Sequence, residues 1–224
     1  MNPGYSPVHQ QFPKVEPVKI LSLDSSSSVV SLACVIIGES NAEIPFRVDT
    51  PHKRSDSSAL FIGLKSAVLS TGLPDAICVG IGPGSYNGLR AGIAASRAFA
   101  TALEIPLFGI PSPLALPGPD TGFWALGDAR GGHYWIACIQ GGTFLLEPML
   151  LSPAECATLL QTQNDFPVLS QAPLQDLAEL RIATPDAVRL AILAKRADPI
   201  MGTPEPLYLK PPSITLPRTL SAGI

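Results

Sequence analysis

A glycine-rich loop and an aspartate followed by serines are the parts of this chain best suited to chemistry. Residues 81–92 read IGPGSYNGLRAG, between an apolar run and an alanine-rich run. Glycines expose backbone N–H groups, and a helix N-terminus favours negative charge, so this loop is a candidate anion or nucleotide site. The candidate residues are Gly82, Gly84, Ser85, Asn87, Gly88 and Arg90. The other interpretation is a tight turn that joins a strand to a helix.

Two well-known loop motifs are excluded by the spacing. A P-loop needs a lysine after its last glycine, and here Leu89 follows Gly88. A GxSxG nucleophile elbow fails because Ser85 is followed by Tyr86 and Asn87 before the next glycine. The loop therefore does not predict a kinase-like or hydrolase-like site on its spacing alone.

Asp24 ends the apolar run VKILSLD and precedes four serines. Its carboxylate can hold a metal–nucleotide, or it can cap a hairpin turn. Asp128 allows the same two interpretations. The three histidines, His9, His52 and His133, form no HExxH motif and no pair at helical spacing. We therefore expect no metal site.

Composition sets further limits. The four cysteines form no CxxC pair, which favours reduced thiols in a cytoplasmic protein. The formal charge of -3 lacks the basic excess of a protein that binds nucleic acid unaided, so an RNA role would need a partner. The apolar runs are too short for a membrane span, and we expect no signal peptide.

Strand-like and helix-like patterns alternate around these loops, which predicts an α/β fold. We expect a strand hairpin at 18–24 and 28–37, helices at 55–72 and 87–104, and strands at 75–81 and 105–110. The first helix has Ser55 or Asp56 as its cap, Leu60, Leu64 and Val68 at helical spacing, and Gly72 at its end. The second helix carries small residues that suit packing on its own sheet or against a partner: Ala91, Gly92, Ala94, Ala95, Ala98 and Ala102.

The Pro- and Gly-rich residues 111–122 predict a junction between two domains. Residues 21–36 and 125–140 align without a gap, which places Asp24 on Asp128 and Cys34 on Cys138, and indicates an internal repeat. We expect an extension at 1–17, domains at 18–110 and 123–210, and a tail at 211–224. In the second domain the patterns predict a strand at 144–151, a helix at 152–161 with a Ser152/Glu155 capping box, a helix at 184–197 capped by Thr184, and a strand at 205–210.

Several of these segments together resemble the TsaB (YeaZ, glycoprotease-like) family, accessory proteins of tRNA threonylcarbamoyladenosine biosynthesis. The resemblance rests on KILSLDSSSSVVSLACV, GIGPGSYNGLRAGIAASRAFATALEIPLFGIPSPLAL, GDARGGHYWIACI and PLYLK, and covers about residues 18–210. It implies the actin-like ATPase (ribonuclease H-like) fold with two related α/β halves. It also implies a cytoplasmic subunit without catalytic residues and without a tightly bound cofactor.

The partners implied by the resemblance are a TsaD-like subunit, a TsaE-like ATPase that brings ATP to the complex, and a second copy of the chain as a homodimer. tRNA would be met only through that complex. The family interface matches the two helices of the first half, with Arg54, Leu60, Leu64, Ala91, Ala94, Ala95 and Ala98 as candidate interface residues.

Some residues depart from the family pattern. Asn87 stands where threonine is usual, Ile81 where arginine often precedes the loop, and Arg54 where an acidic residue is usual. The HxxxH of TsaD is absent, and Asp24-Ser25-Ser26-Ser27 replaces the DxGT phosphate loop of actin-like enzymes. Two alternatives stay open: an actin-like phosphotransferase or ATPase that uses Asp24 and the loop from Gly82 to Arg90, and a self-associating module with another partner.

Overall fold

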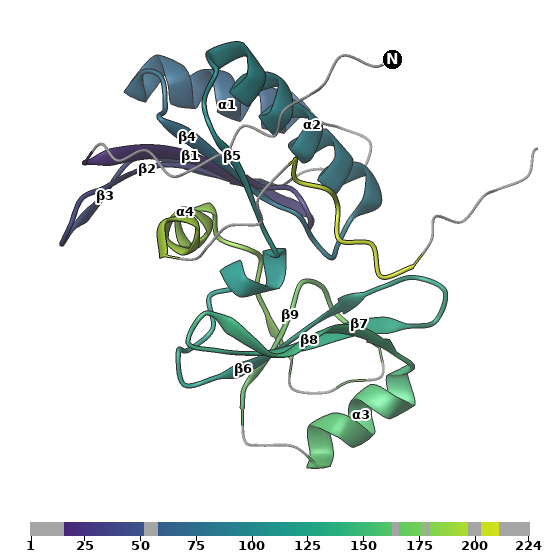
Figure 1. Ribbon diagram of the computed structural model, residues 1–224. Coiled ribbons are helices and arrows are strands. Elements are labelled where there is room, and N and C mark those ends of the chain that lie inside the picture. Colours follow the sequence, from purple (N-terminus) through teal and green to yellow (C-terminus); the bar gives the residue numbers. More distant parts are fainter. Residues whose placement is uncertain are drawn as a thin grey trace, which may run out of the picture.

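The computed structural model describes residues 16–51, 58–162, 166–175, 177, 180–196 and 203–210. Within these residues the chain forms two five-stranded sheets, one above the other in Figure 1, with helices packed on them. The predicted α/β class is therefore confirmed. Predicted features at 1–15, at 211–224 and at Ser55 and Asp56 lie outside the described residues.

The first sheet contains β1 (Val18–Asp24), β2 (Val29–Ile37), β3 (Ala42–Pro51), β4 (Ala76–Gly80) and β5 (Leu107–Ile110), in the order β3-β2-β1-β4-β5. β1, β2 and β3 are antiparallel, whereas β4 and β5 run parallel to β1. The two parallel crossovers are made by α1 (Ser58–Thr71), which follows β3, and α2 (Tyr86–Leu103), which follows β4. Both helices cover the same face of the sheet (Figure 1).

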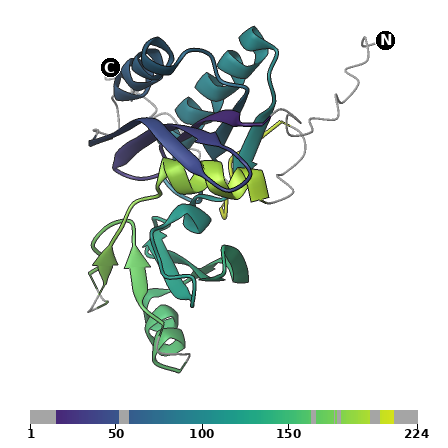
Figure 2. The ribbon, with the colours of Figure 1, turned by 90° about the vertical axis from the view of Figure 1, so that its left-hand side faces the viewer.

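The other face of the first sheet is covered by α4 (Ala187–Arg196), a helix from the second half of the sequence. Figures 1 and 2 show α4 on the side that is turned toward the second sheet. Because both faces are covered, β1 and β4 are buried along almost their whole length and do not alternate between buried and exposed residues. The C-terminal end of β1 therefore lies in the interior, and its last residue, Asp24, is buried.

The second sheet contains β6 (Phe123–Asp128), β7 (Tyr134–Gln140), β8 (Thr143–Leu151), β9 (Val168–Ser170) and β10 (Arg181–Ile182), in the order β10-β9-β6-β7-β8. Its central strand β6 pairs antiparallel with β7 and parallel with β9, as β1 does with β2 and β4. Helix α3 (Pro153–Thr162) packs on β7 and β8. The second half thus repeats the strand plan of the first.

The repeat is offset by one residue in the returning strand. Asp24 pairs with Ser31, but Asp128 pairs with Tyr134, so the second hairpin has one residue fewer between its paired positions. The gap-free alignment that matched Leu32 with Ile136 is therefore shifted by one position after the turn. The domain boundaries 18–110, 111–122 and 123–210 stay predictions.

Two expectations about the second half are wrong. Residues 205–210 form no strand, although Leu207 N–H donates to the carbonyl of Ile81 at 2.8 Å. Helix α4 is not capped by Thr184: the Asp186 carboxylate accepts from Val188 N–H at 2.8 Å. The capping box of α3 is confirmed, with Ser152 and Glu155 bonded to each other in both directions.

Candidate functional site

Asp24 is fully buried, and its carboxylate is held by protein donors on both oxygens. Oδ1 accepts from the backbone N–H and the hydroxyl of Ser26, at 2.8 and 2.7 Å. Oδ2 accepts from the hydroxyl of Ser112 at 2.5 Å. Burial raises the pKa of Asp24, and the hydrogen bonds from Ser112 and Ser26 oppose that rise. In this structure the carboxylate therefore fixes the turn after β1 through buried hydrogen bonds.

Ser112 links Asp24 to the glycine-rich loop. This residue opens a short 3₁₀ helix, η1 (Ser112–Ala115), directly after β5. Its hydroxyl accepts from Gly82 N–H at 2.9 Å while it donates to Asp24, and its own N–H donates to the Gly82 carbonyl at 2.9 Å. A side chain on Gly80 would overlap the Asp24 carboxylate, so glycine is required at the end of β4. The ends of β1, β4 and β5 are thus joined by one buried network.

The glycines of the loop allow a close approach to the serines after Asp24. A Cβ on Gly84 would overlap the Ser26 carbonyl, and one on Gly88 would overlap the Ser25 carbonyl. Ser85 N–H donates to the Ser26 carbonyl at 2.7 Å, and the Ser25 hydroxyl donates to the Gly88 carbonyl at 2.9 Å. The two loops therefore pack backbone to backbone, which accounts for the glycine spacing as a strand–helix junction. Anion binding by this loop stays a prediction.

Helix α2 begins one residue earlier than expected, because Ser85 is its N-cap and accepts from Gly88 N–H at 3.4 Å. Asn87 and Arg90 are exposed in the first turn. The Arg90 guanidinium donates to the Tyr86 hydroxyl at 3.2 Å and lies 5.3 Å from the centroid of that ring. Arg90 is thus turned to the side of the helix rather than held in the buried network of Asp24.

Asp128, the repeat equivalent of Asp24, has a related turn but a different environment. Its carboxylate accepts from Arg130 N–H at 2.7 Å, as that of Asp24 accepts from the N–H two residues later. Asp128 is exposed, and it forms an ion pair with the Arg130 side chain at 3.5 Å. The two aspartates share a local turn, but only the one in the first half is enclosed by the rest of the fold.

The predicted interface residues are divided between the surface and the core. Leu60 and Leu64 are 1% and 4% exposed and pack in the core beneath α1, so their side chains are not accessible to a partner. Ala94 and Ala98 are exposed on α2, and Ala91 and Ala95 are half-buried. Arg54 lies outside the described residues.

The exposed apolar side of α1 was not predicted from the sequence. Phe61, Ile62 and Leu69 are 57, 65 and 76% exposed, next to the buried leucines in the sequence. Helix α1 is apolar almost all round, so its periodicity alone did not separate the inner side from the outer one. Ile62 also lines a groove of about 720 Å³ between β3 and α1.

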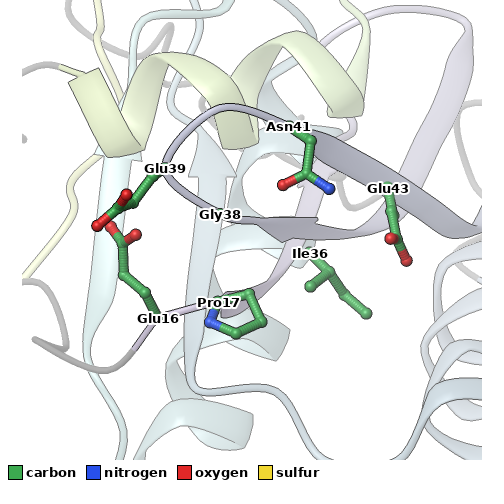
Figure 3. A pocket seen from close by; sticks show the side chains of 7 residues that line it. All are labelled: Glu16, Pro17, Ile36, Gly38, Glu39, Asn41 and Glu43. Atoms are coloured by element: carbon green, nitrogen blue, oxygen red, sulfur yellow. The ribbon is translucent and has the colours of Figure 1, made fainter.

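A second cavity, of about 550 Å³, lies at the opposite end of the first sheet from Asp24. It is lined by residues that precede β1 and by the β2–β3 turn, including Glu16, Glu39 and Glu43 (Figure 3). Glu16 is paired with Lys195 at 2.9 Å. None of the predicted site residues lies in this cavity.

Within the described ranges there is no group of three or more His, Cys, Asp or Glu side chains that could hold a metal ion. The four cysteines are buried and unpaired with one another, and burial raises the pKa of the Cys156 thiol to about 11.

No helix in the part of the chain that the structure describes is long and apolar enough to cross a membrane.

Part of this chain matches a known family model, and part of it aligns with uncharacterized relatives. Residues 44–116, which include α1, the glycine-rich loop and α2, match the family model of TsaD, described as tRNA N6-adenosine threonylcarbamoyltransferase. An uncharacterized protein of Mycobacterium tuberculosis is 30% identical over 136 residues, which are 57% of this chain and 63% of that protein. An uncharacterized protein of Mycobacterium leprae is 29% identical over 141 residues, 61% of this chain and 39% of that protein. The matches thus span less than two thirds of these relatives.

Two solved structures share the fold over most of the chain. YeaZ from Pseudomonas aeruginosa superposes with a TM-score of 0.66 at 21% identity, over 86% of this chain and 100% of that one. A second structure from Pseudomonas aeruginosa, of an uncharacterized protein described as similar to peptidase YeaZ, gives a TM-score of 0.65 at 20% identity, with the same coverage. The chain therefore shares the fold of these YeaZ structures, and the resemblance seen in the sequence is confirmed at the level of the fold.

Proposed function

We propose that this chain is a TsaB-like subunit that binds a TsaD-like enzyme and supports threonylcarbamoyladenosine modification of tRNA, without being the catalyst itself. The observation that carries the proposal is the YeaZ fold over 86% of the chain, together with the TsaD family match over residues 44–116. The partners would be the TsaD-like subunit and a TsaE-like ATPase, and the chain would also form homodimers. ATP would enter with the complex.

The packing of the candidate site supports a non-catalytic role. A phosphate bound between the glycine-rich loop and the serines after Asp24 would need room there, with backbone N–H groups turned toward it. Here Gly84 and Gly88 approach the Ser26 and Ser25 carbonyls so closely that no methyl group fits. Carbonyl oxygens at these positions repel an anion, and the Asp24 carboxylate is already engaged by Ser26 and Ser112.

The surface of α1 and α2 supports partner binding. The three exposed apolar residues of α1 face solvent in the described chain, and exposed apolar groups that gather on one element often mark a protein contact. Ala94 and Ala98 on α2 allow a partner helix to approach closely. We propose that these two helices form the contact with the TsaD-like subunit and, in its absence, with a second copy.

The test is capture of the TsaD-like subunit by a tagged copy of this chain. Ala98→Trp adds bulk to the exposed side of α2 and is expected to abolish capture. Ala154→Trp is the matched control, since Ala154 is exposed on α3, at the far end of the molecule (Figure 1). Equal capture by both variants would place the contact elsewhere, and no capture by the unchanged chain would refute the proposed subunit role.

The alternative, an ATP-using phosphotransferase, is tested by titration with Mg–ATP. It requires tight binding that is lost in Arg90→Gln, because Arg90 is the exposed cation at the start of α2. The proposed subunit role predicts only weak binding of Mg–ATP by the unchanged chain. Turnover of ATP by the purified chain at the rate of an enzyme would favour the alternative.

A further inference from the structure

Two tyrosines from distant parts of the chain form an exposed stack beside the start of α2. The rings of Tyr86 and Tyr208 lie 5.3 Å apart with their planes at 28°, and each residue is 43% exposed. The Arg90 guanidinium lies 5.3 Å from the Tyr86 centroid. We call Tyr86, Arg90 and Tyr208 the tyrosine platform. None of the roles derived above uses the stack.

The platform is held in place by the segment that carries Tyr208. Leu207 N–H donates to the Ile81 carbonyl at 2.8 Å, and the Arg97 side chain donates to the Pro204 carbonyl at 3.1 Å. Lys210 donates to the Arg130 carbonyl in the β6–β7 turn at 2.9 Å. Residues 203–210 therefore run from α2 toward the second sheet, visible beside α2 in Figure 1. An aromatic surface fixed before binding loses little conformational entropy when a ligand arrives.

One cation lies against the rings, and two more lie on the elements that hold the platform in place. The Arg90 guanidinium lies against the Tyr86 ring, and the N-terminal end of α2 adds a partial positive charge. Arg97 and Lys210 bond near the two ends of the segment that carries Tyr208, at the carbonyls of Pro204 and Arg130. Glu205 is the one carboxylate in the sequence of residues 203–210. A flat aromatic face next to cations fits a nucleotide, whose base stacks and whose phosphate is anionic.

Tyrosine and arginine are also frequent at protein contacts. We favour RNA because the large exposed apolar side chains that suit a protein partner lie on α1, whereas the Arg90 guanidinium lies against the Tyr86 ring. We propose that the tyrosine platform binds an unpaired base of single-stranded RNA, with the base stacked on Tyr208 and its phosphates near Arg90 and Lys210.

This inference rests on the proposed function, since a tRNA-modifying complex presents unpaired RNA to its subunits. It deepens that function by giving the chain an RNA contact of its own. A platform of this size holds one or two nucleotides, so the affinity of the isolated chain would be low and would add to that of a partner. This agrees with the formal charge of -3, which argues against strong unaided binding.

The test uses the full chain and a fluorescent single-stranded RNA of about 12 nucleotides, at low salt, with anisotropy as the readout. Tyr208→Leu is expected to raise the Kd about 5-fold or more, because the base–aromatic stack is lost. Tyr208→Phe keeps the ring and is expected to stay within about 2-fold of the unchanged chain. Phe61→Leu, on the exposed side of α1, is the control for loss of an exposed aromatic ring elsewhere.

Three results would overturn the inference. The first is no measurable RNA binding by the unchanged chain, and the second is an equal Kd for Tyr208→Leu and Tyr208→Phe, with both variants shown to be folded by circular dichroism. The third is loss of capture of the TsaD-like subunit by Tyr208→Leu with RNA binding unchanged, which would identify the platform as a protein contact. Because RNA binding is measured on the chain alone, failure of subunit capture and failure of the platform are separate results.

Discussion

The hydroxyl of Ser112 donates to Asp24 Oδ2 at 2.5 Å, across 88 residues of sequence. The same hydroxyl accepts from Gly82 N–H. One serine therefore ties the end of β1, the start of the glycine-rich loop and the start of η1 together inside the protein. Because these groups are buried, we expect that removing any one of their side chains lowers the free energy of unfolding measurably.

Ser112→Ala is expected to destabilise the fold by about 1–3 kcal/mol, because it leaves Asp24 Oδ2 and the Gly82 N–H without the hydrogen bond that each makes to this hydroxyl. Urea unfolding followed by circular dichroism measures the loss. The control is Ser70→Ala on the exposed side of α1, which should change the free energy of unfolding by less than about 0.5 kcal/mol. A similar small change at Ser112 would contradict the importance of the network.

The buried carboxyl makes stability depend on pH. Burial raises the pKa of Asp24 in the folded state above the ordinary 3.8, so the folded protein retains that proton more strongly than the unfolded chain. The stabilisation from the neutral carboxyl is present below pH 3.8 and is lost as pH rises through the folded pKa. The free energy of unfolding of the unchanged chain minus that of Asp24→Asn should therefore fall as pH rises from 4 to 8.

Urea titrations of both proteins across that pH range check this prediction. A difference that grows with pH would mean that the hydrogen bonds from Ser26 and Ser112 stabilise the charged carboxylate more than burial penalises it. The variant keeps the size of the side chain, so packing changes contribute little to the pH dependence.

Gly88→Ala is expected to destabilise the protein by more than about 2 kcal/mol, because the added methyl group meets the backbone carbonyl of Ser25, which cannot move away freely. Gly63→Ala is the matched control within a helix. Its methyl group would lie 3.4 Å from the Leu32 side chain, and alanine is favoured over glycine by about 0.5–1 kcal/mol in a helix. In thermal unfolding, the Tm should therefore fall for Gly88→Ala and rise for Gly63→Ala.

Asp186→Ala is expected to cost about 1 kcal/mol through loss of the N-cap of α4, with a smaller part from the partly exposed ion pair with Arg47 at 3.3 Å. Thr184→Ala should have little effect, because Asp186 and not Thr184 caps this helix. The same urea assay compares them. A larger loss of stability in Thr184→Ala than in Asp186→Ala would instead support Thr184 as the cap of α4, as the sequence pattern predicted.

The sequence pattern located most elements because their signals are local. The hairpin of β1 and β2, helices α1 to α4 and the capping box at Ser152 follow from periodicity, caps and turn residues within a few positions. The strand expected at 205–210 was wrong, since an apolar run can equally lie against other elements as an irregular segment. The cap of α4 was misassigned because Thr184 and Asp186 both have suitable side chains, and the backbone geometry selects one.

The sequence by itself determined the α/β class, the two related halves and the glycine-rich junction before α2, because these depend on residue type and order. Only the tertiary structure decided which partners each residue has. It showed that Leu60 and Leu64 are buried while Phe61 and Ile62 are exposed, that Gly84 and Gly88 meet the carbonyls of Ser26 and Ser25, and that Tyr208 stacks on Tyr86. These contacts join residues that are 58 to 122 positions apart, so they depend on the path of the whole chain, which no local pattern encodes.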